Sequence, residues 1–389
     1  MGFSETERKA RHQAIRQLIK AKNMQAIVFV GDMNVGHSFY GDFRYFADNH
    51  ISFQRQVALA FADSDPILFI YSFFSKKPVE QRAAIKDVRT CSVYASYHGI
   101  KQIDPIIVDV PGAIKERGIT KGRIGINLEI LPVTWYEYLK KELPEVEWMD
   151  FHEDLMEIRF RRSPEELDTY RKGAALGVAG FEAALKIIRP GVTEYQIAAE
   201  IEYAARQEGA GEHFTLIGSG KFAFGDSNTF PLPVYPSERC IEPGDSVVME
   251  ITPRYQGYWT QFVRMVNVGK PNQDLIKMQT VAKDALEAGL EQFRPGKRIN
   301  EVVAAMKDYV DSHGFVGKPP FGHICGVDLV EQRVAPDNDR VIEPGSVAIL
   351  HPMVFTKDGK NVIFWGQTYI ATSDGYERLH RATDEILTV

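Results

Sequence analysis

The chain has 389 residues, of which 44% are hydrophobic and 25% are charged, and its formal net charge is −6. This composition is typical of a globular protein with a large apolar core, and it excludes the broad basic face expected of a nucleic-acid-binding protein. No run of about 18 apolar residues is present, so no membrane span is expected, and the first residues lack the apolar segment of a secretory signal. We therefore expect a cytoplasmic protein. Its three cysteines, Cys91, Cys240 and Cys325, are far apart, which predicts buried thiols rather than disulfides or a zinc knuckle.

The first half of the sequence alternates predicted helices with predicted strands. Apolar residues at near-helical spacing predict helices over 4–22, near 77–86 and near 134–142. Short apolar runs predict strands at 26–30, 57–62, 67–71 and 124–128. This alternation favours an α/β domain with a mixed sheet.

A helix start marks the beginning of a second domain. Ser163 is suited to cap a helix, Pro164 to occupy its first position, and Glu166 to complete a capping box. We place the boundary just before this segment, which predicts domains over 1–157 and 158–389.

The second half contains a repeat. Residues 188–210 and 293–315 each carry an R-P-G turn followed by a helical pattern, at an offset of 105 residues. Residues 241–250 and 342–351 each carry an E-P-G turn followed by a β-rich run, at an offset of 101 residues. Matched segments in the same order predict a duplicated unit with a pseudo-twofold axis. The second offset places His351 at the position of Glu250, so both side chains are predicted to face one central cleft.

Six segments carry a resemblance to the pita-bread hydrolases, which include creatinase, prolidase, aminopeptidase P and methionine aminopeptidase. They read RFRRSPEELDTYRKGAAL, IRPGVTE, IEPGDSVVME, GYWTQFVR, FGHICGVDLVE and IEPGSVAILHP. The first 157 residues look like the N-terminal domain of the creatinase, prolidase and aminopeptidase P branch. The resemblance implies an α/β N-terminal domain followed by an α+β pita-bread domain that contains the repeat.

The resemblance also implies where metal ligands would stand. The peptidases of this family bind two metal ions through two Asp, one His and two Glu. These five positions fall on Glu250, Gln261, His323, His351 and Gly366 of this sequence, with Gln367 beside the last. A glutamine side chain binds hard cations weakly, and glycine offers no side-chain ligand. We therefore expect a divergent member of the family without its paired metals.

The favoured hypothesis is a metal-independent hydrolase that cleaves a C–N bond of a small molecule, similar to creatinase or to the ectoine hydrolases. Glu250 binds or orients the substrate, while His323 and His351 exchange protons. One alternative places a single divalent ion on Glu250, His323 and His351, giving a hydrolase, a lyase or an Xaa-Pro dipeptidase-like enzyme. Another is a catalytically inactive homologue that only binds a small molecule.

Further residues complete the predicted site. Gln261, Glu331, Trp365 and Tyr258 are predicted to contact the substrate. Other aromatic residues are expected to flank the cleft or to belong to the core: Phe222, Phe224, Phe230, Tyr255, Trp259 and Phe364. Cys325 is expected to be a packing residue.

The resemblance finally implies a homodimer. Residues 39–45, with the sequence FYGDFRY, occupy the region that approaches the other subunit's site in creatinase-like dimers. Arg44 and the aromatic residues beside it are therefore predicted to lie close to the partner chain.

Overall fold

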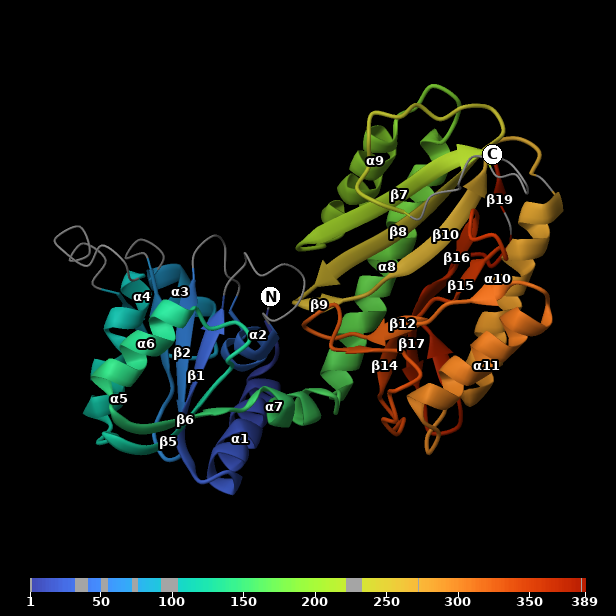
Figure 1. Cartoon of the computed structure of the whole chain (residues 1–389). Helices are drawn as coiled ribbons and strands as arrows, with labels where there is room; N and C mark the ends of the chain where they lie inside the picture. The colour runs from blue at the N-terminus through green and yellow to red at the C-terminus, as the bar shows by residue number, and fades with distance from the viewer. Residues whose placement is uncertain are drawn as a thin grey trace. The chain divides into compact units, whose positions relative to one another are not determined.

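The computed structural model describes residues 2–31, 41–49, 55–71, 76–91, 104–221, 233–271, 273–385 and 387–389. The chain divides into two compact units, Met1–Arg161 and Arg162–Val389 (Figure 1). The predicted boundary at residue 157 is slightly too early, because helix α7 (His152–Arg159) continues past it and belongs to the first unit. No helix within the described ranges is long and apolar enough to cross a membrane.

The first unit is an α/β domain, as the sequence predicts. Its remaining helices are α1 (Glu5–Ala21), α2 (Gly41–Ala47), α3 (Lys76–Arg82), α4 (Pro105–Val108), α5 (Val110–Glu116) and α6 (Val133–Glu142). Its strands are β1 (Met24–Gly31), β2 (Gln56–Phe61), β3 (Ile67–Ile70), β4 (Asp87–Thr90), β5 (Lys121–Ile126) and β6 (Glu145–Asp150). They form a six-stranded sheet in the order β4-β3-β2-β1-β5-β6. The sheet is mixed, because β1 is antiparallel to β2 and parallel to β5.

Alternation along β1 explains the layers of this unit. Val28 packs into a core shared with α4, α5 and α6 on one face of the sheet. Phe29 packs into a second core, shared with α1, α2 and α7, on the other face. A sheet buried on both faces requires strands that are apolar throughout, and β1 and β2 are almost entirely buried.

The second unit contains four helices and a large curved sheet within its described residues (Figure 1). The helices are α8 (Pro164–Ile187), α9 (Glu194–Gln207), α10 (Gln273–Gln292) and α11 (Ile299–Ser312). The strands of the main sheet are β7 (His213–Lys221), β8 (Asp245–Tyr255), β9 (Tyr258–Trp259), β10 (Phe262–Asn267), β12 (Gly322–Ile324), β13 (Gln332–Arg333), β14 (Val347–Leu350), β17 (Gly366–Ala371), β18 (Tyr376–Arg378) and β19 (Leu387–Thr388). A small separate sheet consists of β11 (Val316–Gly317), β15 (Met353–Phe355) and β16 (Val362–Phe364). The capping box that opens α8 is formed by Ser163 and Glu166, as predicted.

The predicted duplication is visible in the backbone hydrogen bonds. The amide of Gly191 donates to the carbonyl of Ile241, and the amide of Gly296 donates to that of Ile342, each at 2.9 Å. The same correspondence holds at the next turn of each half. The Gly244 amide donates to the Val268 carbonyl just after β10, and the Gly345 amide donates to the Ala371 carbonyl at the end of β17, each at 2.8 Å. All four glycines have φ between 83° and 89°, a conformation that favours glycine. The two P-G turns of each half therefore join helix and strand in the same way.

Strand alternation decides which face of the main sheet can hold a site. Val247, Met249 and Ile251 of β8 pack into a core with residues of α8 and α9. Their neighbours Glu250 and Thr252 therefore point to the opposite face, away from these helices. This face carries the polar residues described next.

Candidate active site

Four positions form a row across the face of the main sheet opposite α8 and α9. Glu250 of β8 pairs with Val263 of β10, and Val263 pairs with Gly366 at the start of β17. Gly366 lies directly against His351, which follows the last residue of β14. Residues paired across antiparallel strands share a face, so Glu250 and His351 stand on the same face with two strands between them. We call Glu250, Val263, Gly366 and His351 the site row.

Glu250 is held by the side-chain amide of Gln261. The Gln261 Nε2 donates to Glu250 Oε1 at 2.7 Å and lies 3.4 Å from Thr252 Oγ1. Gln261 is 2% exposed, and its Oε1 has no hydrogen-bond partner among the described residues. Burial raises the pKa of Glu250 to about 7, since a carboxylate loses solvation in this environment. Glu250 is thus suited to gain or lose a proton near neutral pH.

The two predicted histidines form a pair at the other end of the row. The ring centroids of His323 and His351 lie 5.6 Å apart, and the His351 ring packs edge-on against Phe364. The His351 amide donates to the Phe321 carbonyl at 2.9 Å, which ties the end of β14 to the strand that carries His323. Each of the two residues is 8% exposed, and in the described part of the chain neither Nδ1 has a hydrogen-bond partner.

Burial keeps both rings neutral. It lowers the pKa of His323 to about 4 and that of His351 to about 3, and the proximity of His323 lowers the latter further. At neutral pH each ring therefore has one N–H donor and one nitrogen acceptor. Their unpaired Nδ1 atoms and Gln261 Oε1 are buried polar atoms that a bound ligand would satisfy.

Gly366 is a glycine for steric reasons. A Cβ atom at this position would lie 2.1 Å from the Leu350 carbonyl oxygen and 2.5 Å from His351 Cβ. The close approach of β14 and β17 therefore leaves no space for a side chain in the middle of the site row.

The opposite pKa shifts of Glu250 and the histidines predict a pH effect on stability. Each buried histidine has a folded-state pKa below its ordinary value of 6.5, so the unfolded state binds more protons as the pH falls, and stability declines. Glu250 contributes the reverse, because its pKa rises from 4.5 to about 7: its stabilisation is present below pH 4.5 and is lost as the pH rises through 7. We expect Glu250→Gln to steepen the loss of unfolding free energy between pH 6.5 and 4.5.

Urea denaturation at half-unit pH steps measures this slope. The matched control is Glu208→Gln, at the exposed end of α9. Equal slopes in Glu250→Gln and the unmutated protein would contradict the raised pKa of this carboxyl group.

The side chains of three residues predicted to contact substrate interact with partners outside the site row. The Tyr258 hydroxyl donates to Glu166 of α8 and its ring packs edge-on against Tyr170, so it faces the helices. Trp365 packs under the Arg264 guanidinium, whose carbon lies 4.4 Å from the ring centroid. Glu331 forms an ion pair with Arg162, with both side chains at most 1% exposed.

Two threonines of the site were missed by sequence reasoning. Thr252 lies next to Glu250 on the same face and contacts Gln261. Thr368 receives the Gln261 amide hydrogen at 3.0 Å and donates to its carbonyl at 3.2 Å, which locks the backbone of Gln261. The period of two along β8 and β17 is the signal that could have identified them, because Thr252 and Thr368 lie two residues beyond Glu250 and Gly366.

The cysteine predictions are correct except at one position. Cys91 and Cys325 are buried, and burial raises the pKa of the Cys325 thiol well above its ordinary range, as expected of a packing residue. Cys240 is exposed, because it lies in the turn segment that pairs with Thr193 outside the main sheet. Of the predicted aromatic residues, Phe222, Phe224 and Phe230 lie outside the described residues.

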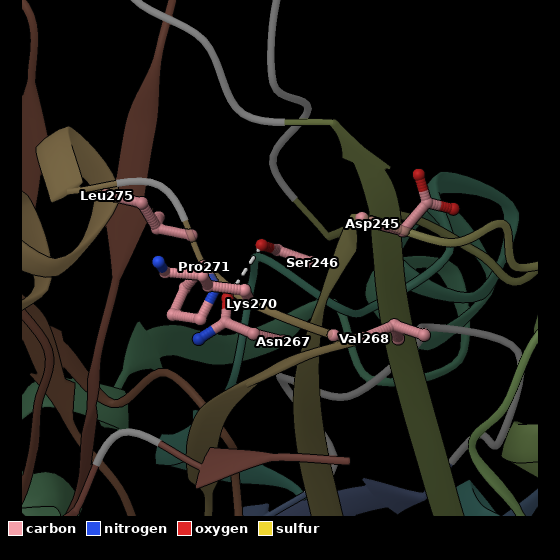
Figure 2. A pocket seen from close by; sticks show the side chains of 9 residues that line it. Asp245, Ser246, Asn267, Val268, Lys270, Pro271 and Leu275 are labelled. Carbon is pink, nitrogen blue, oxygen red and sulfur yellow. Dashed lines mark hydrogen bonds between the residues drawn. The ribbon is translucent and has the colours of Figure 1, made fainter.

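A small open hollow lies elsewhere on the second unit, between the start of β8 and the end of β10 (Figure 2). Ser246 Oγ donates to Asn267 Oδ1 at 2.8 Å on its wall, while the Asp245 carboxylate is bound by Arg239 at 2.7 Å. Ser246 pairs with Asn267 four residues before Glu250, which puts the hollow roughly 13 Å along the strands from the site row. The hollow is therefore separate from the candidate site.

Metal binding at the site row would require several ligating side chains close together. Across the ranges that the structure describes, no three His, Cys, Asp or Glu side chains are grouped so that they could hold a metal ion. The alternative single-ion site on Glu250, His323 and His351 is therefore not supported. Physically, two strands separate Glu250 from His351, the position between them is a glycine, and the Gln261 amide donates a hydrogen to the carboxylate.

Known proteins resemble this chain over most of its length. Creatinase of Bacillus sp. strain B-0618 is 23% identical over 373 residues, which cover 92% of this chain and 86% of that protein. An Xaa-Pro dipeptidase of Pyrococcus horikoshii is 25% identical over 262 residues, covering 66% of this chain and 73% of that protein.

Solved structures share the fold. An X-Pro aminopeptidase from Thermotoga maritima superposes with a TM-score of 0.82 at 19% identity, covering 97% of this chain and 99% of that one. The prolidase from Pyrococcus horikoshii gives a TM-score of 0.80 at 20% identity, covering 97% and 100%. These neighbours confirm the predicted architecture, an α/β N-terminal domain followed by a pita-bread domain.

Family models match both units. Residues 11–161 match the creatinase/prolidase N-terminal domain, and residues 168–373 match metallopeptidase family M24. The second match alone covers more than half of the chain. The chain therefore belongs to metallopeptidase family M24 and is a hydrolase of the creatinase, prolidase and aminopeptidase P group.

Proposed function

We propose that this hydrolase cleaves a C–N bond of a small molecule without the paired metals of its family. One observation carries the proposal: Gln261 Oε1, His323 Nδ1 and His351 Nδ1 are buried atoms without hydrogen-bond partners in the described residues, on the sheet face where Glu250 has a pKa of about 7. Unsatisfied buried polar atoms favour a polar ligand, and a carboxyl group with a pKa near neutrality favours proton transfer.

The pKa values suggest a division of roles. Glu250 takes a proton from water as the water oxygen bonds to the substrate carbon, and it passes that proton to the nitrogen as the C–N bond breaks. The neutral rings of His323 and His351 are weak bases, so we assign them hydrogen bonds to the substrate and to the charge that develops during attack. Gln261 presents its Nε2 to Glu250 and its free Oε1 to a substrate N–H.

The residues at the family's ligand positions support the metal-free state. The amide of Gln261 and the glycine at 366 offer no charge to a second cation, and the described residues contain no group of three side chains that could hold a metal ion. We expect the purified protein to carry no stoichiometric pair of metals and to keep its activity in the presence of a chelator. Elemental analysis and turnover before and after chelation measure this. If elemental analysis gives one metal ion per chain and the chelator abolishes turnover, the mononuclear alternative is selected.

The substrate class is tested with a panel. Creatine, small amides, small amidines and Xaa-Pro dipeptides are incubated with the purified protein, and release of amine or urea is measured. Turnover of a non-peptide C–N compound supports the proposal, and efficient cleavage of Xaa-Pro dipeptides alone would contradict it. Saturable binding of a panel compound with no turnover would select the binding-only homologue.

We propose further that the protein is a homodimer. The predicted partner contact is Arg44 of α2, whose side chain is 11% exposed and whose Nη2 lies 4.0 Å from Asp48 Oδ1. We expect light scattering to give twice the chain mass of 44.0 kDa and Arg44→Glu to weaken the association. Lys9→Glu, at an exposed site on α1, is the control. A monodisperse species of one chain mass at micromolar concentration would contradict the dimer.

A further inference from the structure

An arginine on the opposite face of the sheet holds the middle of the site row. Arg264 follows Val263 on β10, so its side chain points away from the site face. Its Nη1 donates to the carbonyls of Val263 at 2.9 Å and Gly366 at 3.1 Å, and its Nη2 donates to Gln367 Oε1 at 2.8 Å. Two of the four positions in the site row are therefore bonded to one guanidinium group.

The guanidinium group of Arg264 lies in a closely packed environment. Its carbon lies 4.3 Å from the centroid of the Phe262 ring and 4.4 Å from that of the Trp365 ring, distances at which a cation is attracted to an aromatic face. Arg264 is 2% exposed, and burial lowers its pKa to about 10 because the cation loses its solvation. A buried charge of this kind requires a partner charge and hydrogen-bond acceptors.

The partner charge comes from the C-terminal segment. Asp384 Oδ1 accepts from Arg264 Nη2 at 2.7 Å, and its Oδ2 accepts from Arg378 Nη1 of β18 at 3.4 Å. Lys283 of α10 donates to the Asp384 carbonyl. The Asp384 side chain is 46% exposed. A half-exposed carboxylate is thus bonded to a guanidinium group that is buried against the sheet.

Three contacts in series connect Asp384 to His351. Asp384 bonds Arg264, and Arg264 bonds the Gly366 carbonyl. Gly366 in turn lies so close to His351 that a Cβ atom at 366 would be 2.5 Å from His351 Cβ and 2.6 Å from its Cα. Because this contact leaves no free space, a shift of the Gly366 backbone would have to move His351 with it.

We propose that Arg264 and Asp384 are positioning residues that hold Gly366 and thereby place His351 on the site face. Both act through the backbone of Gly366, since Arg264 points to the opposite face of the sheet. The effect on turnover rests on the proposed function, whereas the placement of the His351 ring can be measured without a substrate. A displacement of about 1 Å in a reacting or stabilising group can cost about 10²-fold in rate.

The test uses the full chain labelled with ¹⁵N-histidine, and the ring signals of His351 are assigned by their loss in His351→Ala. Asp384→Asn keeps the size of the side chain and removes its charge, so we expect the His351 signals to shift and kcat to fall about 10-fold with little change in KM. Arg264→Lys keeps the charge but loses the planar fork that reaches Gly366 and Asp384 together. We expect it to shift the His351 signals further and to lower kcat by about 10- to 100-fold.

Two controls separate positioning from a general loss of stability. Glu287→Gln removes another carboxylate partner of Arg378, in the same group of surface charges, and should leave the His351 signals and kcat unchanged. Asp384→Glu keeps the charge and should restore kcat to within about threefold of the unmutated protein.

The outcomes distinguish this proposal from the proposed function. Unchanged His351 signals in both Asp384→Asn and Arg264→Lys, or an equal shift in Glu287→Gln, would overturn the placement of His351 by this chain of contacts. Shifted His351 signals in a protein that turns over no compound of the panel would support the placement and contradict the proposed function.

Discussion

Glu250→Gln is expected to lower turnover by about 10²-fold or more while the fold survives. The substitution keeps the shape of the side chain and removes the group with a pKa of about 7, which is the proton carrier of the proposed reaction. His351→Ala should cause a loss of similar size, because removing one preorganised partner of a developing charge typically costs 10²- to 10³-fold. The measurement is steady-state turnover on the active compound of the panel.

The controls for this prediction lie in the same sheet. Ser246→Ala changes the hollow of Figure 2, which lies along β8 from the site row, and should leave turnover within about twofold. Circular dichroism and thermal unfolding confirm the fold of each variant. Full activity of Glu250→Gln would exclude the carboxyl group as the proton carrier.

Gly366→Ala is expected to destabilise the protein by about 3 kcal/mol. Its new methyl group would meet the Leu350 carbonyl oxygen at 2.1 Å and His351 Cβ at 2.5 Å, and neither atom belongs to a flexible side-chain end. Gly375→Ala, where nothing lies within 4 Å of an added Cβ, is the matched control and should be neutral. Chemical denaturation gives both free energies of unfolding.

The same contact bears on the family's metal centre. His351→Glu restores the family residue at that position but leaves Gln261 and Gly366 unchanged, so we expect no recovery of peptidase activity. Adding Gly366→Glu should unfold the site rather than complete it, because the backbone at 350 and 351 occupies the required space. A stable double variant that binds two metal ions would contradict this account of Gly366.

Local and repeated signals were predictable from the sequence. The capping box of Ser163 and Glu166 involves residues three apart, so its geometry follows from the sequence pattern alone. The duplication was predictable because its turns repeat in the sequence. The structure agrees, since Gly191 and Gly296 adopt the same backbone conformation.

Contacts between distant residues were not predictable in this way. The sequence predicts a substrate contact for Glu331, and no local pattern indicates its ion pair with Arg162, which lies 169 residues earlier. The sequence also predicts that Tyr258 and Trp365 face the cleft, but the face that a strand residue occupies depends on the pairing register, which one sequence does not reveal. Phe262 pairs with Gln367, and this register directs Gln367 towards Arg264 and away from the site row.

The duplication has a consequence for the width of the site. Glu250 belongs to the first half of the repeat and both histidines to the second, and β10 and β17 join the halves in the sheet through two residue pairs. Arg264 adds a bond of 3.1 Å to the Gly366 carbonyl on this short junction. The distance between Glu250 and the two imidazole rings is therefore set by the packing of the two halves at this junction. Substitutions along β10 and β17 should change which substrate sizes are accepted while the reacting groups themselves stay intact.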